Sequence, residues 1–323
     1  MIDFNAMNIK MWSRLGSCGA FGAAMMALAE QDEDLAVITA DLCFYSGLDR
    51  FRQAHPDQLY NVGIAEQNMI GVAAGMASEG YNVFATTYAT FAAARVLDQV
   101  RVNMGYMQLP VKLIGLTAGL SVGILGTTHT SNEDLAAIRS IPNIVVLSPA
   151  DTTETVKAVL AASKENKPVY IRLSGVMGSP LVYKQDYEYT IGKAIRLREG
   201  KDVAIVATGT MVAESLKAAE LLAEQGISVS VIDMHTIKPL DREMLMSCLD
   251  SKLIVTVEEH STLGGLGSAV SEALAEVAHK PPQLLIGLAD HYVHAGDYKY
   301  LLEQYGLTPD GIASKIAGKL AAL

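Results

Sequence analysis

The sequence predicts an α/β protein made of two doubly wound domains with mostly parallel sheets. Short apolar runs alternate with stretches of helical periodicity along the chain, a pattern typical of parallel strands joined by crossover helices. The hydrophobic fraction of 50% suits sheets that are buried on both faces. A length of 323 residues is enough for two such cores, and we place the domains at residues 1–185 and 186–323.

The first domain is predicted from apolar runs that alternate with periodic stretches. Asp151, Thr152 and Glu154 follow Pro149 and form a helix-start signal. The predicted strands are residues 35–40, 83–87, 111–116, 144–147 and 169–173, and the predicted helices are residues 15–30, 66–78, 90–107 and 152–164.

The second domain is predicted from a new alternation that begins after a polar, tyrosine-rich bridge over residues 183–191. It has the same pattern of buried strands and amphipathic helices, so we expect a second doubly wound sheet. The predicted strands are residues 203–207, 229–232, 253–257 and 284–288, and the predicted helices are residues 211–225, 241–249, 265–279 and 298–305.

Charge and cysteine content limit the classes of function. The net charge of -10 and the absence of a basic stripe argue against nucleic-acid binding. Cys18, Cys43 and Cys248 lie far apart without metal-ligand spacing, so we interpret them as buried small hydrophobic residues in a reducing compartment. The first ten residues contain an early acid and no apolar core of a secretory signal. We therefore expect a cytoplasmic protein.

Residues 113–132 form an uncharged stretch that is long enough to cross a membrane. Glycines, threonines and a histidine interrupt it throughout, which favours a strand followed by a glycine-rich loop. We therefore expect no membrane span.

The motif Asn61-Val-Gly-Ile-Ala-Glu66-Gln-Asn-Met69 places one carboxylate at the start of a predicted helix, directly after a short β-branched run. The glycine before it lets the backbone approach a ligand closely. On these residues alone, Glu66 could equally serve only to complement the helix dipole. The helix that follows is rich in small residues that would permit close packing, namely Gly71, Ala73, Ala74, Gly75 and Ala77.

Four further strings follow this motif in a fixed order: Gly80-Tyr-Asn-Val-Phe-Ala-Thr-Thr-Tyr-Ala-Thr-Phe91, Gly126-Thr-Thr-His129, Ile141-Pro-Asn-Ile-Val-Val-Leu-Ser-Pro149 and Val257-Glu-Glu-His-Ser-Thr-Leu-Gly-Gly265. With the first motif, they resemble the thiamine-diphosphate-binding pyrimidine domain and the C-terminal domain of transketolase. The resemblance covers nearly the whole chain.

Transketolases usually carry a further domain that binds the cofactor's diphosphate through a Gly-Asp-Gly motif. That triplet does not occur in this sequence. The resemblance therefore implies the C-terminal subunit of a split transketolase. We expect a separate N-terminal, diphosphate-binding subunit that carries Mg²⁺ or Ca²⁺, and a homodimer of this chain within a heterotetramer.

The resemblance also assigns site residues. Glu66 matches the catalytic Glu that hydrogen-bonds the cofactor's aminopyrimidine ring, and such a carboxyl should lie in an apolar pocket, where desolvation raises a carboxyl pKa. His129 matches a catalytic His that contacts substrate oxygens, although a lone His is more often structural. The other matches are Phe91, which would stack on the pyrimidine unless it is simply core; Tyr88, Asp41, Leu42 and Ile64 at the cofactor; and Arg14 and Ser46 at a substrate phosphate.

This sequence departs from the family pattern at the substrate side. Ile124 and Leu125 stand where the family usually has an acidic pair that recognises a donor hydroxyl. Gly175 occupies the apparent place of a phosphate-contacting Arg, and a phosphate-binding His expected near Thr117 is absent. Losing a bidentate Arg removes a strong anion contact. Modified or non-phosphorylated sugars are therefore expected as substrates.

Together these features predict transfer of a two-carbon ketol unit from a ketose to an aldose. One alternative is another thiamine enzyme, such as a deoxyxylulose phosphate synthase or the β subunit of a 2-oxo acid dehydrogenase. A non-catalytic partner subunit is a second alternative, which the loss of the acidic pair favours and the presence of Glu66, Phe91 and His129 opposes.

Overall fold

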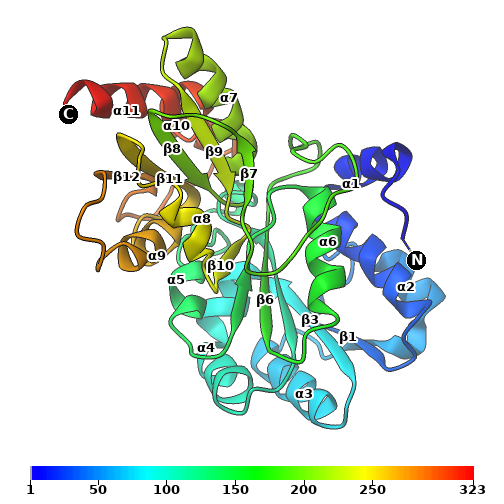
Figure 1. Cartoon of the computed structure of the whole chain (residues 1–323). Coiled ribbons are helices and arrows are strands. Elements are labelled where there is room, and N and C mark those ends of the chain that lie inside the picture. Colours follow the sequence, from blue (N-terminus) through cyan, green and yellow to red (C-terminus); the bar gives the residue numbers. More distant parts are fainter. Residues whose placement is uncertain (1) are drawn as a thin grey trace.

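A computed structural model describes residues 2–323 and shows two mostly parallel sheets with helices packed on them (Figure 1), which confirms the predicted fold class. The first sheet has the order β10-β5-β6-β4-β3-β1-β2, and all its neighbours are parallel except the pair β10 and β5. Its strands are β1 (Leu35–Thr39), β2 (Leu59–Asn61), β3 (Asn82–Tyr88), β4 (Lys112–Ala118), β5 (Val145–Leu147), β6 (Val169–Ser174) and β10 (Thr236–Lys238).

The second sheet has the order β12-β11-β8-β9-β7, with only the edge strand β7 antiparallel to its neighbour. The predicted boundary near residue 185 lies in the segment between β6 and β7, and it stays a prediction. Strand β10 comes from the second half of the chain but pairs with β5, so the second half supplies one edge strand of the first sheet. The strands of the second sheet are β7 (Ile195–Arg198), β8 (Val203–Ala207), β9 (Val229–Asp233), β11 (Leu253–Ser261) and β12 (Gln283–Leu288).

Helices cover both faces of the first sheet. Apolar side chains of α1 and α6, such as Trp12 and Val159, pack on one face, and those of α3, such as Ile70, pack on the other. The start of α6 follows the sequence signal, because the Asp151 side chain accepts a hydrogen bond from the Glu154 N–H at 2.9 Å. The helices here are α1 (Ala6–Ala29), α2 (Asp49–Ala54), α3 (Glu66–Ser78), α4 (Leu97–Gln99), α5 (Asp134–Arg139) and α6 (Thr152–Ala162).

The second sheet is likewise flanked by helices. Ile205 on β8 and Val255 on β11 belong to a separate apolar cluster on one face. Val206 and Ile254, from the same strands, belong to the cluster that contains Ile70 of α3, so the two halves share part of their core. Within residues 2–323 no helix is both long and apolar enough to cross a membrane. The helices are α7 (Met211–Glu224), α8 (Arg242–Met246), α9 (Leu266–Ala273), α10 (Tyr298–Gln304) and α11 (Pro309–Ala321).

The helix predicted over residues 90–107 is not a single α-helix. Phe91–Arg95 and Val100–Tyr106 are π-helical and flank the short α4. A π-helical turn contains an extra residue, which rotates the side chains that follow it, and such turns are frequent at functional sites. This irregular segment carries Phe91 and Arg95.

Candidate active site

The candidate site lies at the carboxyl ends of three neighbouring strands of the first sheet. Asp41 follows β1, Tyr88 ends β3, and the loop after β4 carries His129. Glu66 begins α3, just beyond the end of β2. Doubly wound sheets bind ligands at this edge, because the loops that follow parallel strands meet there.

Glu66 is the first residue of α3 and is buried, with 4% of its surface exposed. Its Oε1 atom accepts a hydrogen bond from Arg95 Nη1 at 2.7 Å. The sequence predicted apolar surroundings for this carboxyl, and that prediction is wrong where Arg95 contacts it. Met69 is buried one turn later, but the irregular segment after β3 brings a guanidinium to the carboxylate.

Phe91, Tyr88 and His129 form an aromatic cluster next to Glu66. The ring centroids are 5.9 Å apart for Tyr88 and Phe91, 5.6 Å for Tyr88 and His129, and 5.4 Å for Phe91 and His129. All three pairs have edge-to-face geometry, the favoured arrangement of aromatic rings. The structure thus brings together three residues that the sequence singled out separately.

Arg95, which no sequence motif marked as a site residue, joins this cluster to Glu66. Its Cζ atom lies 3.7 Å from the centre of the Phe91 ring, within cation–π distance. The Arg95 side chain therefore lies on the Phe91 face while it pairs with the Glu66 carboxylate. The spacing of four residues between Phe91 and Arg95 was the available sequence signal.

His129 lies at the end of a loop formed by residues 119–132. Its N–H donates to the Gly126 carbonyl at 3.0 Å, and its Nδ1 atom lies 2.9 Å from the Thr128 hydroxyl oxygen. Ile124 and Leu125, in the short 3₁₀ turn of this loop, are 75% and 48% exposed. They therefore form an apolar rim on the same loop as His129.

Asp41 is fixed by the first residue of the Glu66 motif. Asn61 Nδ2 donates to Asp41 Oδ1 at 2.9 Å, and the Asp41 N–H donates to Asn61 Oδ1 at 3.0 Å. Asp41 also has a positive φ of 61°, a conformation that Asp tolerates better than most residues. This double link holds the loop after β1 against the entry to α3.

The four other predicted residues lie at different depths. Ile64 is 79% exposed and Leu42 is half-buried. Arg14 is exposed on α1. Ser46 is fully buried, and its hydroxyl donates to the Leu42 carbonyl at 2.8 Å, so it does not face solvent where a phosphate would bind.

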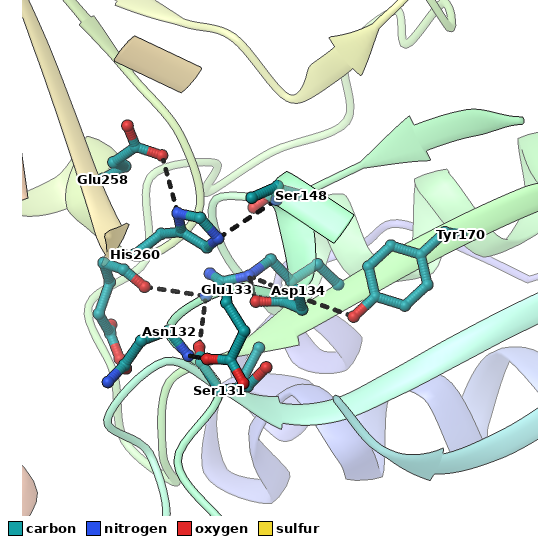
Figure 2. Close-up of polar contacts among 12 residues, drawn as sticks. Ser131, Asn132, Glu133, Asp134, Ser148, Tyr170, Glu258 and His260 are labelled. Atoms are coloured by element: carbon teal, nitrogen blue, oxygen red, sulfur yellow. Dashed lines mark hydrogen bonds and ion pairs between the residues drawn. The ribbon is translucent and has the colours of Figure 1, made fainter. Parts of the chain in front are cut away.

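Arg172, the arginine of β6 that precedes Gly175, is fully buried. Its Nε atom donates to Asp134 Oδ2 at 2.9 Å, and Tyr170 donates to the same oxygen at 2.8 Å. Figure 2 shows Tyr170 and Asp134 in this contact. Burial alone would raise the pKa of Asp134, but the positive charge of Arg172 holds that pKa below its ordinary value. Arg172 is therefore a structural residue, and its guanidinium is not available to bind a substrate phosphate.

Comparison with protein families identifies the two halves. Residues 17–175 match the transketolase pyrimidine-binding domain, and residues 192–312 match the transketolase C-terminal domain. The chain therefore belongs to the transketolase family.

Individual relatives include proteins that are subunits. A 6-deoxy-6-sulfo-D-fructose transketolase subunit of Clostridium sp. strain MSTE9 is 42% identical over 88% of this chain and 88% of its own length. A solved structure described as a split-gene transketolase, an inactive β4 tetramer, has a TM-score of 0.85 and 39% identity, covering 94% of this chain and 98% of that one. The 1-deoxy-D-xylulose-5-phosphate synthase of Gloeobacter violaceus is 40% identical over 93% of this chain but only 48% of its own length.

Proposed function

We propose that this chain supplies the pyrimidine-binding side of a transketolase site, and that the site transfers a two-carbon ketol unit once a separate diphosphate-binding subunit completes it. The observation that carries the proposal is the position of Arg95. It lies between the Glu66 carboxylate and the Phe91 ring, the two groups that the family pattern places directly on the aminopyrimidine ring of the cofactor.

The residues around Arg95 fit thiamine diphosphate. A guanidinium is flat and carries N–H donors, and here it is held by a carboxylate oxygen and by an aromatic face. An aminopyrimidine ring is also flat and needs the same two contacts. The Arg95 side chain is 44% exposed, and the proposal requires it to leave the Glu66 carboxylate and the Phe91 ring when the cofactor binds. When bound, the cofactor would supply the nucleophilic carbon that takes up the ketol unit.

The chain's own residues then divide the remaining work. Glu66 would hold a ring nitrogen and exchange a proton with it, and Phe91 would orient the ring. His129, beside the Phe91 ring, would donate to or accept from a substrate oxygen. Asp41 and Leu42 would border the ring at the end of β1, and Tyr88 would complete the wall behind His129. We propose that Mg²⁺ or Ca²⁺ is bound by the partner subunit together with the diphosphate.

The isolated chain is expected to bind thiamine diphosphate weakly and to be inactive, because only the pyrimidine end of the cofactor finds its ligands here. Calorimetry with thiamine diphosphate and Mg²⁺ would measure the binding, and a ketose-plus-aldose assay with and without the diphosphate-binding subunit would measure turnover. Robust turnover by the chain alone would contradict the proposal. The relative described as an inactive β4 tetramer supports the expectation.

The isolated chain is also expected to associate with itself. Gly71 and Gly75 lie on the exposed side of α3, and a methyl group at either position would meet no atom within 4 Å. This face can therefore accept the close approach of a second copy, which gives the homodimer proposed within a heterotetramer. Light scattering that shows only a 34.5 kDa species, alone and with the partner, would contradict the assembly.

Donor choice is expected to differ from that of an enzyme with acidic residues at positions 124 and 125. Ile124 and Leu125 carry no group that can pair with a donor hydroxyl, and both are exposed in this chain. Once the partner subunit covers the site and buries that hydroxyl, leaving it unpaired costs roughly 1–3 kcal/mol, or about five- to 150-fold in kcat/KM. We expect xylulose 5-phosphate and fructose 6-phosphate to be poorer donors than a differently substituted ketose. One relative is named for a sulfonated ketose, 6-deoxy-6-sulfo-D-fructose, which supports this expectation. If xylulose 5-phosphate has the highest kcat/KM in a donor panel, this prediction fails.

A second candidate is one half of a deoxyxylulose phosphate synthase, which the 40% identity to the Gloeobacter protein favours. That reaction uses pyruvate as donor, whereas ketol transfer uses a ketose. Release of CO₂ from pyruvate by the assembled enzyme, without ketol transfer from any ketose, would support this candidate instead.

A further inference from the structure

The loop that carries His129 is held along its whole length by the second half of the chain. This loop, residues 119–132, belongs to the first sheet, yet four hydrogen bonds tie it to residues between 259 and 296. The bonds are Leu120 N to Glu259 Oε1 at 2.6 Å, Gly296 N to Gly123 O at 3.1 Å, Thr127 Oγ1 to Val293 O at 2.8 Å, and Ser261 N to Asn132 O at 2.8 Å.

Glu259 is the only charged side chain among these four contacts. It is 2% exposed and uses both carboxylate oxygens. Oε1 accepts from the Leu120 N–H, while Oε2 accepts from the Thr210 hydroxyl at 2.6 Å and from the Tyr298 hydroxyl at 2.7 Å. The two hydroxyls thus aim the carboxylate at the first turn of the loop, and hydrogen bonds to a charged acceptor are the strong ones.

The backbone of Glu259 is linked to the other end of the loop. Arg172 Nη2 donates to the Glu259 carbonyl at 2.8 Å and to the Ser131 carbonyl at 3.3 Å. Figure 2 shows Ser131 and Asn132 beside this buried network, with Asp134 next to them. Glu259 therefore contacts the entry of the loop directly and its exit through one shared guanidinium.

The glycines of the loop match this close contact. Gly119 has φ of 68°, and a Cβ atom there would lie 2.4 Å from Glu259 Oε1. A Cβ atom on Gly123 would lie 2.2 Å from Leu301 Cδ1 and 2.7 Å from the Gly296 carbonyl oxygen. Only glycine leaves room for the second half of the chain at these two positions. The glycine-rich composition of the loop is thus explained by what packs against it.

We propose that Glu259 is a positioning residue, which sets the loop conformation that brings His129 to Phe91 and Tyr88. The two ends of the loop are buried, but its middle is exposed at Ile124, Leu125, Thr127 and Thr128, so apolar burial alone holds that part weakly. The effect of Glu259 on the loop conformation follows from the contacts described above. Its effect on substrate turnover rests on the proposed ketol transfer.

The test compares Glu259→Ala with Glu259→Gln and with Glu154→Gln. The amide introduced by Glu259→Gln keeps an oxygen for the Leu120 N–H, and the Thr210 and Tyr298 hydroxyls can turn to accept from its NH₂ group, so this variant should preserve the loop. Glu154 is an equally buried carboxylate, bound to the Ala150 N–H at 2.7 Å and the Tyr187 hydroxyl at 2.9 Å, with no contact to the loop. It controls for the general effect of altering a buried acid.

Hydrogen exchange on the isolated chain gives the first readout. Glu259→Ala should speed amide exchange in residues 119–132 by about tenfold or more, the effect of losing one hydrogen bond to a charged group. Glu259→Gln and Glu154→Gln should leave exchange in this loop near the wild-type rate. If Glu259→Ala does not fold, Thr127→Val removes a single tether at an exposed site and should speed exchange locally over residues 124–129. Unchanged loop exchange in the folded variant would overturn the proposal.

Kinetics of the assembled enzyme give the second readout. Glu259→Ala should lower kcat/KM for the ketose by about tenfold or more, with cofactor affinity unchanged, and Glu259→Gln should restore it. If Glu259→Ala speeds exchange in the loop but no assembled enzyme, wild type included, transfers a ketol unit, the positioning role of Glu259 is supported and the proposed function is overturned. An equal loss in Glu259→Ala and Glu154→Gln would instead show a general stability effect and overturn the positioning role.

Discussion

Replacing Glu66 by Gln is expected to lower the turnover of the assembled enzyme by about a hundredfold to ten-thousandfold, the usual contribution of a positioned proton-transfer group. The amide keeps the shape of the side chain at the start of α3 but cannot exchange a proton with a ring nitrogen. It also loses the charge that pairs with Arg95. Steady-state kinetics at saturating thiamine diphosphate would measure the loss, and thermal unfolding would show that the variant folds.

A control separates this role from simple interaction with the helix dipole. Glu214 lies in the first turn of α7 and pairs with Lys217 at 2.9 Å, away from the candidate site. A first-turn acid contributes about 0.3–1 kcal/mol through the helix dipole. If Glu66→Gln and Glu214→Gln both cost only that much stability and leave turnover near normal, Glu66 is not the activating carboxylate.

The sequence predicted regular elements best where their signals are local. Residues 66–78 and 203–207 were predicted as a helix and a strand, and α3 and β8 have those bounds. Helix α11 was missed although it begins with a clear signal, Thr308 followed by Pro309, and the Thr308 side chain accepts from the Gly311 N–H. Strand β10 could not be predicted, because three residues carry no periodicity and pair with β5 in the other half of the chain.

The candidate site was predictable as a set of residues but not as a set of contacts. The family strings singled out Glu66, Phe91 and His129, and the structure places the latter two in ring contact. Arg95 was missed because its approach to Glu66 depends on the π-helical segment, for which the sequence has no recognised signal. Glu259 lies in the family string of residues 257–265, but no role could be predicted for it, because its partner Leu120 is far away along the chain.

The buried pair of Arg172 and Asp134 is expected to be the most sensitive point for stability. Both side chains are at most 1% exposed, and removing one partner of such a pair leaves an unpaired buried charge that costs about 3–5 kcal/mol. Arg172→Leu should therefore lower the free energy of unfolding by about that amount at pH 7. Urea unfolding would measure it, and Arg101→Leu, which breaks an exposed pair with Asp98, should cost less than about 1 kcal/mol.

The pH dependence of Arg172→Leu tests the cause of this loss. In the wild type the pKa of Asp134 is lower when folded than when unfolded, so the pair stabilises the fold at neutral pH and loses this effect as the pH falls through the folded pKa. Without Arg172, burial opposes ionisation of the stranded Asp134 carboxyl, so lowering the pH favours its protonated form and relieves the variant. The difference in unfolding free energy between wild type and variant should thus shrink as the pH is lowered below neutral. The double variant Asp134→Leu with Arg172→Leu should be more stable than Arg172→Leu at pH 7, because no charge is left unpaired. A pH-independent difference would show that lost packing, not the stranded charge, destabilises the variant.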